Sequence, residues 1–170
     1  MAETLAKNIT EMLSGSVSKE MIVFIISMLP ILELRGGTIA AALMHVPFVK
    51  AAAICVVGNL LPIPFILLLV NWIFTEMKKS KHLKGIAEKL EDKALKKSDN
   101  IRKYEFAGLL FFVGIPLPGT GAWTGALIAA LLRIDIKKSF LAITLGVLLA
   151  LLIMCTITYF IPWVIAMIAG

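Results

Sequence analysis

Three long runs without a charged residue constrain the fold of this chain more than any other feature. The runs are Ala51 to Thr75, Phe106 to Leu132 and Ser139 to Gly170. Each is longer than the roughly 20 apolar residues that a helix needs to cross a bilayer. The mean hydropathy of the chain is +0.94, and 16% of its residues are charged, against about a quarter in a soluble domain. The sequence therefore predicts an all-α integral membrane protein.

The second of these runs is broken near its middle. Pro116, Pro118, Gly119 and Gly121 lie where a plain spanning helix would be continuous. Proline removes a helical hydrogen bond, and glycine increases the freedom of the backbone. A broken backbone persists at bilayer depth only where it is buried in protein or lines a wet cavity. The segment over residues 116–125 is therefore the first candidate for a functional site.

An earlier segment, Ile26 to Leu43, repeats this pattern of a break followed by small residues. Five pairs of positions match across the two copies: Pro30 with Pro116, Thr38 with Thr124, Ala40 with Ala126 and, after two residues inserted later in the second copy, Lys50 with Lys138 and Gly58 with Gly146. Secondary transporters are often duplicated in this way, and their sites lie where interrupted helices of the two halves meet. We therefore expect two inverted repeats, each a broken or re-entrant helical hairpin followed by a spanning helix. Chance similarity between segments rich in alanine, leucine and glycine is the alternative.

These features divide the chain into four segments. Residues 1–18 predict an amphipathic N-terminal helix on the membrane surface, and Ser18 is a candidate N-cap for the next helix. Residues 19–75 form the first repeat, with a hairpin over 21–45 and a span over 48–74. Residues 76–103 form a basic cytoplasmic linker. Residues 104–170 form the second repeat, with a hairpin over 104–132 and a span over 137–168.

The basic linker sets the expected topology, because positive charge marks the cytoplasmic side of a membrane protein. If both broken segments are re-entrant, the linker and the turn from Arg133 to Lys138 share that side. If all four apolar segments cross the bilayer, this turn lies outside. The charge rule favours the re-entrant arrangement, and four kinked spans are the alternative. Acidic residues alternate with the lysines of the linker and no aromatic residue stands between them, so we expect no nucleic acid partner.

Two charged residues, Glu33 and Arg35, lie within the first broken segment. A charge at the bilayer centre costs about 2.5–3.5 kcal/mol on insertion scales, so charges there are usually paired and functional. On a helix, residues two apart point to different faces. The two side chains therefore pair only if the backbone is not helical, or each has a partner elsewhere. The alternative is that both lie at the membrane surface and end a helix.

Polar and small residues around the two breaks complete the candidate binding site for a substrate or ion. Glu33 is a candidate proton carrier, and Arg35 is a candidate ligand for an anionic group. The other members supply hydroxyls, an indole or backbone amides that face an anion: Gly36, Thr38, Pro116, Pro118, Gly119, Thr120, Gly121, Trp123 and Thr124. Close packing of helices through small residues is the competing explanation for the glycines.

The sequence also limits the chemistry. It contains no Ser-His-Asp arrangement, P-loop, nucleotide fingerprint or metal-ligand spacing, and Cys55 and Cys155 stand alone within apolar runs. We therefore expect no enzyme activity, no cofactor, no metal and no ATP-driven pumping by this chain. A chain with so few helices cannot easily enclose a path for a substrate, so we expect a homodimer. We expect this dimer to lie among the lipids of a prokaryotic cytoplasmic (inner) membrane.

Two stretches resemble the signatures of the small multi-drug export protein family: Pro30-Ile-Leu-Glu-Leu-Arg-Gly-Gly and Ile115-Pro-Leu-Pro-Gly-Thr-Gly-Ala-Trp-Thr-Gly-Ala-Leu-Ile-Ala. That family is more distantly similar to the DedA membrane proteins. The DedA resemblance implies two inverted re-entrant hairpins and movement of lipid-linked phosphates such as undecaprenyl phosphate, coupled to ions. DedA proteins carry arginines around the second motif, whereas this chain has Val113 and Thr120 near those places.

Together the residues and the resemblance favour a secondary transporter of an amphipathic or anionic substrate, with a lipid phosphate and proton coupling through Glu33 as the specific expectation. Two alternatives stay open. One is a proton-coupled exporter of small cationic drugs, and the other is a membrane scaffold that does not transport and uses the basic linker to bind a partner.

Overall fold

The computed structural model describes residues 4, 17–80, 83–95, 99–117, 119–161, 164 and 167. The predicted N-terminal helix over 1–18 falls almost wholly outside these residues, as does Pro118. In the described part the chain is helical and contains no strand, which confirms the all-α prediction. The helices are α2 (Lys19–Met28), α3 (Glu33–Leu43), α4 (Phe48–Leu60), α5 (Ile63–Lys79), α6 (Lys84–Leu95), α7 (Asp99–Gly114), α8 (Ala122–Leu131), α9 (Ile136–Cys155) and the π-helix Thr156–Phe160.

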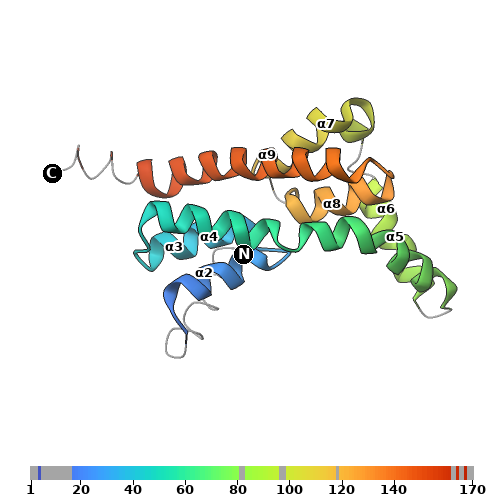
Figure 1. Cartoon of the computed structure of the whole chain (residues 1–170), viewed down its shortest axis with the longest axis horizontal. Coiled ribbons are helices and arrows are strands. Elements are labelled where there is room, and N and C mark those ends of the chain that lie inside the picture. Colours follow the sequence, from blue (N-terminus) through green and yellow to red (C-terminus); the bar gives the residue numbers. More distant parts are fainter. Residues whose placement is uncertain are drawn as a thin grey trace.

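Two helical stretches in the described residues are long and apolar enough to cross a membrane, Phe48–Val70 and Ile136–Phe160. Both follow the long axis of the molecule (Figure 1). They run in opposite directions, because the Phe48 ring at the start of α4 contacts the Tyr159 ring near the end of the second stretch, with centroids 5.7 Å apart. The first stretch is interrupted between α4 and α5 at Pro62, where proline removes a helical hydrogen bond.

The first broken segment is a helical hairpin made of α2 and α3. Ser18 caps α2, as predicted, by accepting a hydrogen bond from the Met21 N–H at 3.3 Å. The Lys19 ammonium at the start of α2 donates to the Met44 carbonyl after α3 at 3.1 Å, so these two ends lie together. Each helix is about 15 Å long at 1.5 Å per residue. Neither helix is therefore long enough to cross a hydrocarbon layer about 30 Å thick.

The second broken segment contains α7, the break at residues 115–121, and α8. Its apolar parts, Tyr104–Gly114 and Ala122–Leu131, are again short. The helix α7 begins before the predicted hairpin and bends at Glu105, whose φ is 32°. It runs beside α9 so closely that a Cβ on Gly146 would lie 2.7 Å from the Leu110 carbonyl oxygen. The backbone of α7 therefore contacts α9 where a larger residue would not fit.

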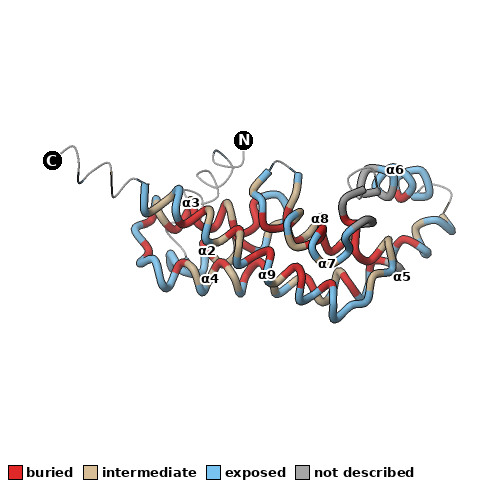
Figure 2. Tube along the Cα trace, turned by 90° about the horizontal axis from the view of Figure 1, so that it is seen from above, coloured by how far each residue is buried: buried red, intermediate tan, exposed pale blue. Residues whose placement is uncertain are grey.

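The linker helix α6 packs at the end of the molecule where α5 and α8 end. Ala87 is fully buried and forms a small apolar cluster with Val70, Phe74 and Ala130. Figure 2 shows the buried residues along the inner faces of the packed helices and the mostly exposed α6 at one end. The linker therefore lies at the same end as the turn that joins α8 to α9.

Candidate functional site at the hairpin tips

The two broken segments meet at Glu33, the first residue of α3. Its carboxylate accepts one hydrogen bond from the Ala122 N–H and one from the Trp123 N–H, each at 3.1 Å. These amides open α8, and the first N–H groups of a helix have no acceptor within it. Gly121 precedes them and has no side chain to cap the helix. A carboxylate from the first hairpin therefore caps a helix of the second, at the end where the helix dipole favours negative charge.

Gly121 makes this contact sterically feasible. A Cβ on Gly121 would collide with Glu33 Oε2 and lie 2.7 Å from the carboxyl carbon. Its φ of 137° is also a conformation that residues with side chains rarely adopt. Both the space and the backbone conformation therefore require glycine here.

Arg35 binds the other side of the second break. Its guanidinium donates to the Leu117 carbonyl at 2.5 Å, to Thr120 Oγ1 at 2.9 Å and to the Ile115 carbonyl at 3.5 Å. These oxygens lie just after the end of α7. The last C=O groups of a helix have no hydrogen-bond donor within that helix. The positive charge thus lies at the carbonyl end of α7, which the helix dipole also favours.

Glu33 and Arg35 are therefore partnered separately, which is one of the two arrangements that the sequence left open. Glu33 is 6% exposed and Arg35 is half-buried. The φ of Glu33 is 50°, an unusual value for a residue with a side chain and one that is concentrated at functional sites. We call this pair of contacts the tip lock: Glu33 on the start of α8, and Arg35 on the end of α7 with Thr120.

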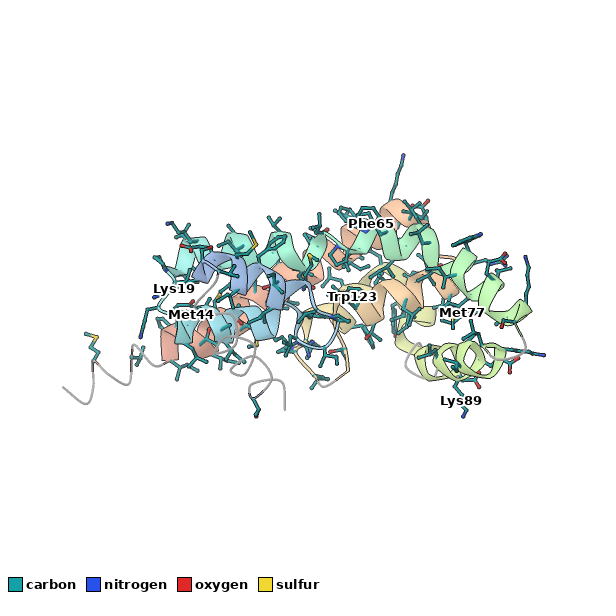
Figure 3. All side chains as sticks on the ribbon, turned by 90° about the horizontal axis from the view of Figure 1, so that it is seen from below. Lys19, Met44, Phe65, Met77, Lys89 and Trp123 are labelled. Atoms are coloured by element: carbon teal, nitrogen blue, oxygen red, sulfur yellow. The ribbon has the colours of Figure 1, made fainter. Side chains whose placement is uncertain are left out.

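The other predicted site residues lie around the tip lock in different ways. Thr38 is buried and donates to the Arg35 carbonyl at 2.9 Å, so its hydroxyl serves its own helix. Gly36 faces Leu32 within the first hairpin, which is the packing role proposed for the small residues. Pro116 and Gly119 belong to the break itself, and Gly119 has a φ of 76°. Trp123 contributes its backbone amide, and its indole lies in the central part of the molecule (Figure 3).

Sequence reasoning missed three residues of the tip lock. Ile115 and Leu117 contribute carbonyl oxygens and Ala122 contributes an N–H, so their side chains carry no signal of the role. The signal in the sequence was the break, because a helix that stops leaves backbone groups without partners.

Two apolar grooves are lined in part by residues at the hairpin tips. The first follows α7, has a volume of about 540 Å³ and includes Tyr104, Phe111, Phe112, Ile115, Leu117 and Thr120 in its lining. The second lies along α5, has a volume of about 730 Å³ and includes Pro30, Pro62, Phe65, Trp123 and Thr124. The indole N–H of Trp123 is buried and has no hydrogen-bond partner among the described residues.

A comparison with models of protein families matched residues 33–153 to a family described as "Putative small multi-drug export protein". The match covers the tip lock, the first spanning stretch, the linker and the second spanning stretch as far as residue 153. Neither the curated proteins nor the solved structures contain a match to this chain.

Proposed function

The chain belongs to the small multi-drug export protein family, and from that premise we propose that it is a proton-coupled membrane exporter whose gate is the tip lock. The observation that carries the proposal is the cap of Glu33 on α8, because it joins the two hairpins through one titratable side chain. The family description names an export protein rather than an enzyme, and two helical stretches within the described residues are long and apolar enough to span a membrane.

A proton weakens this lock by removing a charge. A hydrogen bond to a charged group contributes about 1.5–3 kcal/mol, and a neutral one contributes about 0.5–1.5 kcal/mol. Protonated Glu33 also loses its attraction to the positive end of α8. The hairpin tips then separate more easily, which opens the centre of the molecule to a substrate. Return of Glu33 to the charged form restores the cap.

Matching details in the two halves support internal duplication. His45 after α3 and Arg133 after α8 have φ values of 54° and 55°. The next residues donate to equivalent carbonyls, Val46 to Ala41 at 2.9 Å and Ile134 to Ala129 at 3.0 Å. A Cβ on Gly58 would meet the Phe24 carbonyl and Ser27, and a Cβ on Gly146 would meet the Leu110 carbonyl and Val113.

These pairs also change the alignment of the two copies. Positions before the breaks differ by 86 (110 − 24), and positions after them differ by 88 (133 − 45). The two extra residues thus belong in the second break, not after Thr124. Glu33 in the first half then corresponds to Gly121 in the second half. The carboxylate and the glycine that leaves space for this carboxylate therefore occupy equivalent positions.

The proposed inverted topology predicts which side of the membrane each repeat exposes. Lys50 and Lys138 are exposed and lie at equivalent places after the two hairpins. We expect a membrane-impermeant maleimide to label Lys50→Cys in intact cells and to label Lys138→Cys only after permeabilisation. Cys55 and Cys155 are buried, so background labelling is low. Labelling of Lys138→Cys from outside contradicts the re-entrant arrangement in favour of four spans.

Transport itself is tested with two fluorescent probes of opposite charge. We expect purified protein in vesicles to export ethidium or carboxyfluorescein when a pH gradient is imposed, and the preferred probe gives the sign of the substrate charge. An anionic preference supports the lipid-phosphate expectation, and a cationic preference supports a drug exporter. The scaffold is favoured instead if neither probe is transported and if deletion of residues 77–98 abolishes the protein's function in cells. The homodimer and the inner-membrane location remain parts of this proposal.

A further inference from the structure

The groove along α7 ends on a set of oxygen atoms that already hold a positive charge. Ile115, Leu117 and Thr120 line the groove, and the same three residues accept the hydrogen bonds of the Arg35 guanidinium. Thr120 Oγ1 lies 3.0 Å from the Ile115 carbonyl and 2.9 Å from the Leu117 carbonyl, so the three oxygens converge. Such a cluster of partial negative charge selects a cation.

The rest of the groove is apolar and partly aromatic. Tyr104, Phe111 and Phe112 lie along its wall, and the faces of aromatic rings attract positive charge. Its volume of about 540 Å³ falls within the range of about 300–1,000 Å³ found for small-molecule sites. The groove therefore offers an apolar body and an oxygen-lined end, which matches an organic cation with a hydrophobic part.

We propose that this groove binds a lipophilic organic cation, whose charge replaces the Arg35 guanidinium on the oxygens of Ile115, Leu117 and Thr120. Arg35 acts as a tethered competitor: it fills the cation position when the tip lock is closed and leaves it when the hairpin tips separate. The inference rests on the proposed export function and names the class of substrate for it. An anionic group is disfavoured at this position once Arg35 has left it, because the exposed oxygens then repel negative charge.

Tetraphenylphosphonium and tetraphenylborate test the charge preference, since they share one shape and differ in sign. We expect the purified protein in detergent to bind the phosphonium more tightly than the borate in a titration followed by calorimetry. Tighter binding of the borate overturns the proposal. Arg35→Ala is expected to raise phosphonium affinity about tenfold, because the competing cation is removed, whereas Arg35→Lys keeps the affinity low. Loss of phosphonium binding in a folded Arg35→Ala protein also overturns it.

Two phenylalanines that line different grooves provide a matched control. Phe111 is 55% exposed and Phe65 is 61% exposed, so truncation of either is expected to leave the fold intact. Phe111→Ala is expected to weaken phosphonium binding about tenfold through loss of the ring contact, while Phe65→Ala leaves it unchanged. Equal effects of the two substitutions contradict the assignment of the cation to the α7 groove.

Export measured on the same variants separates this inference from the function it rests on. If pH-driven ethidium export persists but Phe111→Ala does not alter phosphonium binding, the groove assignment is wrong and the exporter stands. If phosphonium binds as expected but no export of either probe occurs, the site stands and the proposed function fails.

Discussion

Glu33→Gln is expected to abolish proton-driven export. Exchange of substrate across the membrane in the absence of a pH gradient is expected to remain measurable. Glutamine keeps the shape of the side chain and one acceptor oxygen, but it carries no charge and cannot bind or release a proton. It also turns an NH₂ group toward one of the two helix amides that now meet carboxylate oxygens, at 3.1 Å each. Comparing gradient-driven efflux of ethidium with ethidium counterflow in vesicles separates the two activities.

Glu20→Gln is the control for this substitution. Glu20 lies in the first turn of α2, at an exposed position away from the hairpin tips. Its replacement is expected to leave both activities at the parental level. Proton-driven efflux that persists in Glu33→Gln shows that the titrating group lies elsewhere and removes Glu33 from the coupling mechanism.

Gly121→Ala is expected to give a large loss of stability for a single added methyl group. The backbone of Gly121, with φ of 137° and ψ of −176°, costs an L-residue about 1–3 kcal/mol, and the new Cβ collides with the Glu33 carboxylate. Displacing that carboxylate removes charge-assisted hydrogen bonds that contribute about 1.5–3 kcal/mol. We expect the free energy of unfolding in detergent to fall by about 2.5–6 kcal/mol, the sum of these two ranges, and export to be lost.

Gly85→Ala is the matched control for the added methyl group. Gly85 lies on the exposed helix α6, and a Cβ there meets nothing within 4 Å. Alanine stabilises a helix by about 0.5–1 kcal/mol relative to glycine, so the free energy of unfolding of this variant is expected to be slightly higher than that of the parent. A Gly121→Ala protein that unfolds like Gly85→Ala means that Glu33 does not lie against Gly121.

The general architecture followed from the positions of the proline, glycine and charged residues. Uncharged runs predicted the apolar helices, and the prolines and glycines of the two breaks predicted where helices end, because their backbone effects are local. Ser18 was identified as a helix cap because capping, too, depends only on neighbouring residues. The bend of α7 at Glu105 was not predicted, since a glutamate carries no local signal for a positive φ.

The candidate site was predicted less completely than the fold. Glu33 and Arg35 stood out because charge is rare within an apolar segment, and Thr120 and Gly121 stood out as parts of the break. Their partners were hidden, because backbone groups of Ile115, Leu117 and Ala122 bind the two charges and any side chain supplies those groups. The alignment of the two copies placed the extra residues after Thr124, since weak letter matches do not locate an insertion within a loop.

Hydrogen–deuterium exchange at Ala122 and Trp123 tests the tip lock most directly. Their amides open α8 and have the Glu33 carboxylate as acceptor, so their protection depends on a residue about ninety positions away. We expect both amides to exchange slowly in the parent protein and the amide that faces the NH₂ group to exchange quickly in Glu33→Gln, while amides in the middle of α8 keep their protection in both. Equal exchange of the Ala122 and Trp123 amides in the two proteins would show that Glu33 does not hold the hairpin tips together.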